Sequence, residues 1–409
     1  MTPAPHDILI SGGGIAGLTA AAAFGTAGFS VLCVDPAPPV TGAEAEGADL
    51  RSTAFLQPAR KVLEAAGLWD RLAPHAAALR VMRIVDAGGA DPAPGQTPAP
   101  RVVRDFDSAD LSGAAFGWNL PNWLLRREMV ARLEELPNVD FRPGTATTSL
   151  FTRTAEARVG LSDGSRARAR LVIAADGRNS PMRQAAGIGT KVTRFGQKAL
   201  AFAVTHPIPH ENVSTEIHRS GGPFTLVPLP DRDGLPCSAV VWMEEGRRAL
   251  DLAKMDEAAF EAEMNDRSCL LFGPLKLVTR RSVWPIIAQE AERLSGERLA
   301  LLAEAAHVVP PIGAQGLNMS LTDLATLLDL AQARPEGLGD ATMLEAYHRA
   351  RMADVRLRVA GITALNRTSM QGAQPLRDLR AAGITALYGL APVRRMLMQM
   401  GLGARAENS

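Results

Sequence analysis

The feature that most restricts the fold is a glycine-rich turn near the start of the chain. Residues 7–11 (DILIS) are typical of a buried parallel strand, and residues 12–17 (GGGIAG) open an alanine-rich stretch with helical character. In the strand–turn–helix unit that binds dinucleotides, one glycine allows the turn, one admits the pyrophosphate and one lets helix and strand approach closely. The spacing of Gly12, Gly14 and Gly17 matches this unit and predicts a dinucleotide site.

The surroundings of the turn support this prediction. A second strand-like run, FSVLCVD, ends at Asp35, where a carboxylate can accept hydrogen bonds from the ribose hydroxyls. The amides of Ile15 and Ala16, at the start of the expected helix, offer partial positive charge to phosphates. Two other interpretations remain open: a turn that only packs a helix on a sheet, and a membrane span over residues 8–34, which the glycines disfavour.

Composition narrows the class of protein. A chain of 409 residues is long enough for two or three packed units. Its 44 basic and 43 acidic side chains argue against a nucleic-acid binder with a strong positive field over its whole surface, and leave local basic patches open. Cys33, Cys237 and Cys269 lie far apart, and the histidines have no metal-ligand spacing, so we expect no metal site. The amino terminus has no secretory signal, so we expect a cytoplasmic protein.

Two further strand-like runs end in polar, glycine-containing turns. One run ends at Asp176 and Gly177, and the other, RLALLAEAAHVVPPIGAQGLN, leads into a long helix. In a doubly wound sheet the carboxyl ends of such strands line one crevice, where ligands bind. The sequence therefore predicts a single site made from three separate turns.

Several motifs together resemble one known family. The chain is similar to the class A flavoprotein monooxygenases with the para-hydroxybenzoate hydroxylase fold, and among these to the UbiH, UbiF and UbiL hydroxylases of ubiquinone biosynthesis. The motifs that carry the resemblance are GGGIAGLTAA, AADGRNSPMR, AEAAHVVPPIGAQGLN, GWNLPNWLLRREMVARLEELPNV, GGPFTLVPLPDRDGLPCSAVVW and LYGLAPVRRMLMQMGLG.

The resemblance implies an α/β fold with α+β elements, built from interleaved parts. A Rossmann-like FAD-binding domain would comprise residues 1–75, 100–185 and 284–345, and a mostly antiparallel β-sheet substrate domain residues 76–99 and 186–283. C-terminal helices would follow over residues 346–409. Short alternating runs between residues 191 and 284 independently indicate a sheet. Its apolar residues are candidates for a pocket wall, although a core role is the favoured interpretation: Phe202, Phe224, Leu226, Val240 and Trp242.

The resemblance also implies the chemistry. NADPH or NADH, bound transiently, would reduce FAD, and the flavin would react with O2 to give a C4a-hydroperoxide that hydroxylates an electron-rich ring. The substrate would be a polyprenylated phenol, with the ring position left open. The alternatives are a hydroxylase of a soluble aromatic compound and a non-catalytic flavin-binding scaffold in a biosynthetic complex.

The third turn is the expected electrostatic part of the site. It opens a helix, so its amides can stabilise negative charge on the flavin ring. Pro310 and Pro311 would form a wall beside the flavin, unless they only initiate the helix. The candidate catalytic residues are Pro310, Pro311 and Gly313. The candidate cofactor-binding residues are Gly12, Gly14, Ile15, Ala16, Gly17, Asp35, Arg51, Arg126, Asp176, Gly177, Glu304, Gly316, Leu317 and Asn318.

Arg51 and Asp176 have a competing interpretation, and the sequence at Glu304 departs from the family pattern. Arg51 is alternatively a solvated loop charge, and Asp176 alternatively a strand-end turn residue. Most of the family has Gly-Asp where this chain has Ala303 and Glu304, which we interpret as a subgroup trait rather than a weakened flavin site. We expect His307 to be structural.

The C-terminal region is basic. From residue 346 onward it has ten arginines and no lysine against three acidic residues. The run AAGITALYGLAPVRRMLMQMGLG mixes apolar residues with arginine, as an interfacial helix does. The candidate partners are therefore the inner face of the plasma membrane, other ubiquinone-biosynthesis enzymes and an identical subunit, while packing onto the flavin domain is the alternative. We expect no nucleic acid.

Overall fold

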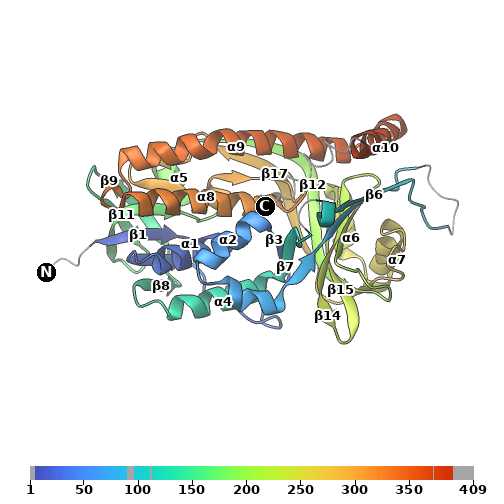
Figure 1. Ribbon diagram of the computed structural model, residues 1–409, viewed down its shortest axis with the longest axis horizontal. Helices are drawn as coiled ribbons and strands as arrows, with labels where there is room; N and C mark the ends of the chain where they lie inside the picture. Colours follow the sequence, from blue (N-terminus) through green and yellow to red (C-terminus); the bar gives the residue numbers. More distant parts are fainter. Residues whose placement is uncertain (1–4, 90–95, 111–112, 372, 390–409) are drawn as a thin grey trace.

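The computed structural model describes residues 5–89, 96–110, 113–371 and 373–389, which form two large sheets, a small sheet between them and covering helices (Figure 1). The α/β fold with added antiparallel sheet and C-terminal helices is confirmed. Figure 1 shows the first sheet on the left, the second on the right, and α9 along the upper edge over both.

The first sheet has a parallel core in the order β19–β11–β1–β2–β8, extended by antiparallel strands. The side chains of Ile8, Leu9 and Ile10 are all fully buried, as expected for a central parallel strand covered on both faces. Its strands are β1 (His6–Ser11), β2 (Val31–Asp35), β8 (Val139–Pro143), β9 (Thr147–Thr152), β10 (Ala157–Leu161), β11 (Arg166–Ala174), β18 (Ser295–Gly296) and β19 (Leu299–Leu301).

Helices from distant parts of the chain cover this sheet. The glycine turn leads into α1, which packs on α4 and α8. The third turn leads into α8, which packs along α9. The α-helices of this half are α1 (Ile15–Thr26), α2 (Gln57–Ala65), α3 (Trp69–Leu72), α4 (Asn122–Glu134), α5 (Pro181–Ala185), α8 (Gln315–Ala333) and α9 (Ala341–Ser369). The 3-10 helices are η1 (Ala73–His75), η2 (Ser108–Asp110), η3 (Ala303–Ala305) and η4 (Pro335–Gly337).

The second sheet is mostly antiparallel, in the order β20–β17–β12–β15–β14–β13–β5–β6, with β13 and β5 parallel. Its strands are β5 (Val81–Asp86), β6 (Val102–Asp107), β12 (Thr190–Thr205), β13 (Val213–His218), β14 (Pro223–Arg232), β15 (Leu235–Glu245), β16 (Lys276–Leu277), β17 (Ser282–Ala291) and β20 (His307–Val308). Two helices pack against it, α6 (Gly246–Lys254) and α7 (Glu257–Arg267). The small third sheet consists of β3 (Ser52–Leu56), β7 (Gly117–Pro121) and β4 (Ala77–Leu79).

The two faces of the second sheet have different neighbours. The five residues that we treated as pocket-wall candidates all belong to one buried cluster with Phe260 and Met264 of α7, so the core interpretation is confirmed. The alternate positions point the other way: Ala199 and Met243 cluster with Ile312, which lies in the third turn. Successive residues of a strand face opposite sides of the sheet. The face toward the flavin half therefore consists of the residues that alternate with the five candidates.

Two expected domain boundaries fall inside the second sheet. β6 was expected in the FAD-binding part, but it pairs with β5 throughout its length. β17, expected to fall mainly in the FAD-binding part from residue 284, pairs with β12 from Thr190 to Ala201. In both cases the hydrogen-bonded partner strand, which is remote in sequence, decides where the segment belongs.

The C-terminal region is helical where it is described. Asp340 caps α9 by accepting a hydrogen bond from the amide of Met343 at 2.8 Å. The following helix, α10 (Gln374–Gly389), packs on β6, where Arg101 pairs with Asp378 at 2.6 Å. None of the described helices combines the length and hydropathy needed to cross a bilayer. The last part of the predicted interfacial run lies outside the described residues.

Candidate active site

The three glycines of the first turn have different roles. A Cβ on Gly12 would clash with the carbonyl of Ala175, and a Cβ on Gly17 would clash with the carbonyl of Gly12. A Cβ on Gly14, in contrast, would meet no atom within 4 Å. Gly12 and Gly17 are therefore required for packing, and Gly14 alone borders open space.

The first helix begins without a protein cap. Gly14 is its N-cap, no side chain caps it, and its first turn carries no acidic residue. The amides of the first turn of a helix have no intrahelical acceptor, so Ile15 and Ala16 carry donors that suit a phosphate. Asp35 lies beside the same turn, where its carboxylate accepts hydrogen bonds from Gly13 N at 2.5 Å and Ala37 N at 2.9 Å.

The second turn lies directly against the first. Asp176 Oδ2 accepts hydrogen bonds from Met182 N at 3.1 Å and from Ser11 Oγ at 3.4 Å. Burial raises the pKa of the Asp176 carboxyl, against the lowering effect of these hydrogen bonds. Gly177 follows with a φ of 84°, a conformation that favours glycine. These bonds support the alternative interpretation of Asp176, a residue that holds the turn to β1 and α5.

Glu304 joins the third strand end to the second turn. Its carboxylate is exposed and lies 3.3 Å from Nε of Arg178. The preceding Ala303 has a φ of 56°, so this alanine adopts the left-handed conformation that favours glycine. An alanine at this position therefore has a conformational cost that a glycine would not have.

Arg51 is held in a cluster instead of being free in solvent. Its guanidinium donates two hydrogen bonds of 2.7 Å to Asp49 and lies 5.4 Å from the centre of the Trp284 ring. Arg126 approaches the same carboxylate at 3.6 Å, and Asn122 donates to it at 3.0 Å. Burial by itself would raise the pKa of the Asp49 carboxyl. The hydrogen bonds and positive charges of these partners outweigh burial, so the pKa is lowered.

The third turn has an unusual backbone. Gly313 and Ala314 have consecutive positive φ angles, 63° and 55°, and α8 then begins at Gln315 with neither a side-chain cap nor an acidic residue in its first turn. Gly313 and Gly316 are exposed, whereas Pro310 is buried. The amides of Gln315, Gly316 and Leu317 have no intrahelical acceptor, so the turn presents donors to an anionic group.

Asn318 differs from its expected role. Its side chain accepts a hydrogen bond from Leu56 N at 2.8 Å, and donates to Ala54 O at 2.8 Å and Ala314 O at 2.6 Å. These three hydrogen bonds use the side-chain amide of Asn318 to fasten α8 to β3 and to Ala314. Any contact of Asn318 with a cofactor would have to come from its backbone.

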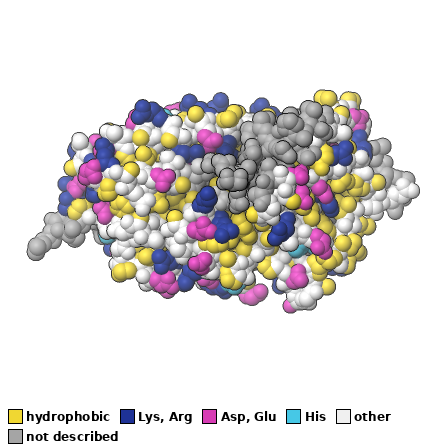
Figure 2. Space-filling model, viewed as in Figure 1, with side chains coloured by type: hydrophobic (Ala, Val, Ile, Leu, Met, Phe, Trp, Pro, Cys, Tyr) yellow, Lys and Arg dark blue, Asp and Glu magenta, His cyan; other side chains and the backbone are white. Residues whose placement is uncertain are grey.

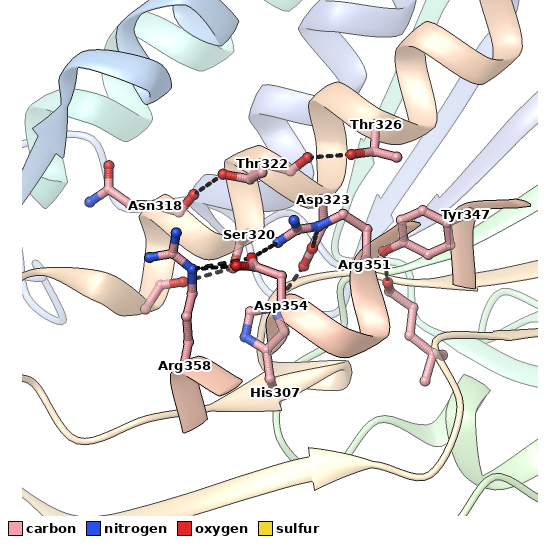
Figure 3. Close-up of polar contacts among 12 residues, drawn as sticks. His307, Asn318, Ser320, Thr322, Asp323, Thr326, Tyr347, Arg351, Asp354 and Arg358 are labelled. Carbon is pink, nitrogen blue, oxygen red and sulfur yellow. Dashed lines mark hydrogen bonds and ion pairs between the residues drawn. The ribbon is translucent and has the colours of Figure 1, made fainter. Parts of the chain in front are cut away.

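His307 is buried inside the protein. Its Nε2 lies 2.7 Å from Oδ2 of Asp323, a fully buried residue of α8 (Figure 3). Asp323 also accepts a hydrogen bond from Arg351 of α9 at 2.6 Å. This packing agrees with the structural role that we expected for His307.

Sequence reasoning missed three contributors to the site. Arg178 pairs with Glu304, Asp49 organises Arg51, and Trp284 packs under Arg51. Asp49 and Trp284 belong to no motif with fixed spacing, whereas Arg178 directly follows Asp176 and Gly177 in the AADGRNSPMR motif. Trp284 pairs with Ala199 and lies on the face toward the flavin half, which alternation along the strands does not identify.

A basic pocket of about 550 Å³ lies beside the second turn. Four cationic side chains line it, so it suits a ligand with several negative charges. Gln197, at its floor, is almost fully buried and accepts a hydrogen bond from Asn366 of α9 at 2.8 Å. Its cationic residues are Arg178, Arg183, Arg194 and Lys198.

The described residues fit a flavin dinucleotide. Two uncapped helix starts, one next to an open Gly14 and one next to an exposed Gly313, provide donors for a pyrophosphate and for a ring that carries negative charge. The contacts of Gly12 with Ala175, and of Glu304 with Arg178, bring the three turns together. The described part of the chain has no cluster of three or more potential metal ligands.

Comparisons with known proteins agree with this geometry. A sequence profile described as "FAD binding domain" matches residues 6–360. Ubiquinone hydroxylase UbiL of Rhodospirillum rubrum is 32% identical over 400 residues, which cover 97% of this chain and 89% of that protein. The 3-demethoxyubiquinol 3-hydroxylase of Escherichia coli is 27% identical, over 98% of this chain and 100% of that protein.

Solved structures share the fold. The p-nitrophenol 4-monooxygenase PnpA of Pseudomonas putida DLL-E4 superimposes with a TM-score of 0.77 and 19% identity, over 98% of this chain and 99% of that chain. At this level of identity the likeness extends to the architecture of the molecule only.

Proposed function

The chain belongs to the FAD-binding domain family of flavin monooxygenases, in the group of the ubiquinone hydroxylases, and from this premise we propose that it hydroxylates a polyprenylated phenol during ubiquinone biosynthesis. The reaction uses FAD, a reduced nicotinamide cofactor and O2. The observation that carries the proposal is the convergence of three turns, with two uncapped helix starts, in a chain 32% identical to UbiL along nearly its whole length.

FAD, when bound, takes electrons from the nicotinamide cofactor and uses them to activate O2 for attack on the ring. The protein binds FAD and orients it. We assign the pyrophosphate to the start of α1, with Gly14, Ile15 and Ala16, and the ribose to Asp35. We also assign Arg51 and Arg126 to the cofactor, and both of these guanidinium groups pair with Asp49.

The third turn is assigned to the ring of FAD. The amides that follow Gly313 stabilise negative charge on the ring, and the Pro310–Pro311 segment excludes water beside it. Ile312 lies in the same cluster as Met243 of the second sheet, so this turn meets the sheet at apolar side chains. An apolar junction of this kind suits an aromatic substrate with a polyprenyl tail.

The basic pocket is assigned to the nicotinamide cofactor. NADPH and NADH carry a pyrophosphate, and Arg178 and Lys198 project charge into a space of adequate volume. Only the first turn has the glycine spacing of a dinucleotide site, so the cofactor would dock without a domain of its own. Arg194→Gln is expected to raise the KM for the cofactor with little effect on FAD content, and an unchanged KM would remove this assignment.

The decisive experiment uses the visible spectrum of the purified protein and complementation. A bound flavin spectrum, together with restored respiratory growth of a strain lacking one ubiquinone hydroxylase, would support the proposal and identify the ring position. The Gly14→Val variant is the matched negative control. Bound flavin without rescue of any deletion would favour a soluble aromatic substrate or a non-catalytic scaffold, and a colourless protein that does not rebind FAD would refute the cofactor sites.

We also propose that the outer face of α9 and α10 contacts the inner leaflet of the plasma membrane. Leu357, Leu365, Leu376 and Leu379 are all at least 43% exposed. Figure 2 shows Lys and Arg side chains along the edge of the molecule over α9. Exposed leucines next to arginines suit an anionic lipid surface, where a polyprenyl tail would also lie.

The membrane proposal has its own test. Leu357→Ser combined with Leu365→Ser should lower binding to liposomes containing phosphatidylglycerol, with FAD content unchanged. The control is Leu250→Ser, at a leucine of α6 that is 43% exposed. Equal lipid binding by the wild type and the double variant would refute the proposal.

A further inference from the structure

A continuous chain of polar side chains connects His307 to the C-terminal helix α9 (Figure 3). His307 Nε2 lies 2.7 Å from Asp323, and Asp323 accepts a hydrogen bond from Arg351 Nε at 2.6 Å. The other end of Arg351 pairs with Asp354 at 2.9 Å. Asp323 is fully buried and Arg351 is 6% exposed, so solvent weakens the inner contacts little.

The chain of contacts continues from α9 back to the third turn. Arg358 donates to Asp354 at 3.0 Å and, through a second nitrogen, to Gln315 Oε1 at 2.9 Å. Gln315 Nε2 donates in turn to the carbonyl oxygen of Gly313 at 2.9 Å. The segment from His307 to Gln315 is therefore fastened to α9 at both of its ends.

These contacts hold a turn, Gly313–Ala314, whose backbone conformation is unfavourable for a residue with a side chain. Ala314 has the left-handed conformation, which costs a residue with a Cβ about 1–2 kcal/mol. The hydrogen bond from Gln315 Nε2 restrains the orientation of the Gly313 carbonyl. A turn held in this way presents its N–H groups to a ligand rather than its carbonyl oxygens.

We propose that Arg358 and Gln315 are positioning residues, which hold the Gly313–Ala314 turn with its amides directed at the ring of FAD and so set the midpoint potential of the bound cofactor. The inference rests on the FAD binding of the proposed function and is independent of the substrate. FAD becomes more negative at the ring when it is reduced, and fixed amides favour that state. If the turn is less firmly held, its amides should stabilise reduced FAD less strongly relative to oxidised FAD.

The test compares Arg358→Gln and Gln315→Met with Arg356→Gln. Arg356 lies on the same helix, is 58% exposed and, among the described residues, has a single ion pair, at 3.9 Å with Glu290, so it is a matched control. In the Arg358 and Gln315 variants, the affinity for reduced FAD should fall about tenfold more than the affinity for oxidised FAD, which lowers the midpoint potential by ~30 mV. Arg356→Gln should leave the potential at the wild-type value.

Three outcomes decide the inference. A lowered potential in the two variants, with partial recovery in Arg358→Lys, supports it, since lysine can keep one of the two contacts. An unchanged potential, or an equal shift in Arg356→Gln, overturns it while leaving the proposed hydroxylation intact. If a variant does not retain FAD, amide hydrogen exchange of residues 313–317 in the apoprotein decides, and exchange equal to the wild type overturns the inference.

Discussion

Gly17 lies so close to the carbonyl oxygen of Gly12 that no side chain fits between them, whereas Gly14, in the same turn, borders open space. We therefore expect Gly17→Ala to lower the free energy of unfolding of the apoprotein by several kcal/mol, about the cost of overpacking combined with backbone displacement. Gly14→Val should fold with near wild-type stability and lose bound FAD. Urea unfolding and the absorbance of the purified variants measure both effects, and a yellow Gly14→Val protein would contradict the placement of the pyrophosphate.

Asn318→Ala should destabilise the protein even without cofactor. The substitution removes one buried and two partly buried hydrogen bonds between α8, β3 and Ala314, each worth about 1 kcal/mol, and leaves backbone groups unpaired, for a total of about 2–4 kcal/mol. Thr326→Ala on the same helix, whose hydroxyl makes an exposed hydrogen bond to Thr322 O, should change stability by less than about 0.5 kcal/mol. If the apoproteins of both variants unfold alike, Asn318 has no structural role and direct cofactor contact becomes the better explanation.

Ala303→Gly and Ala314→Gly should each stabilise the protein. A left-handed alanine costs about 1–2 kcal/mol, and the greater freedom of unfolded glycine offsets about 0.4–1 kcal/mol of that. The expected net gain is about 0.5–1 kcal/mol. Ala360→Gly, at an exposed position within α9, should show the opposite sign and lose about 1 kcal/mol. A loss of stability at Ala303 would mean that its methyl group contributes packing that outweighs the strain.

The stability gained by Asp176→Asn should depend on pH. Burial raises the pKa of the Asp176 carboxyl in the folded state, so the charged form costs stability at pH 7. Asparagine removes that charge and can still accept from Met182 N and Ser11 Oγ. The variant should be more stable than the wild type at neutral pH. The difference should shrink as pH falls through the raised pKa toward the unfolded value, because the folded wild type then takes up its proton.

Unfolding curves at pH 7 and pH 4.5 check this sign. A variant that is less stable at both values would show that the Asp176 carboxylate makes an attractive contact outweighing its burial.

A feature of the fold or of the site could be predicted from the sequence when the contacts that determine it lie close together along the chain. The turn of Gly12, Gly14 and Gly17 was predictable because its requirement for glycine arises within one strand–turn–helix unit. The role of Asn318 was not, since its partners Ala54 and Leu56 lie more than 200 positions away in the sequence. Spacing alone cannot distinguish an amide that binds a cofactor from one that binds a remote strand.

The second sheet illustrates a different limit. Alternation identified two faces, but nothing in the sequence specified which face meets the flavin half. The covering helices α6 and α7 decide it, because they bury the row of Phe202 and Trp242 and leave Met243 on the other side. For the same reason the placement of β6 followed from its partner β5 and not from its own residues.

The strand order of the first sheet has a consequence for synthesis on the ribosome. β1 ends at Ser11, yet its neighbour β11 begins only at Arg166, and β19, which pairs with β11, only at Leu299. The apolar β1 and α1 therefore leave the exit tunnel long before the strands that complete their sheet. Such long-range parallel pairing is slow and leaves apolar surface exposed. We expect the nascent chain to depend on chaperones until its third turn has been translated.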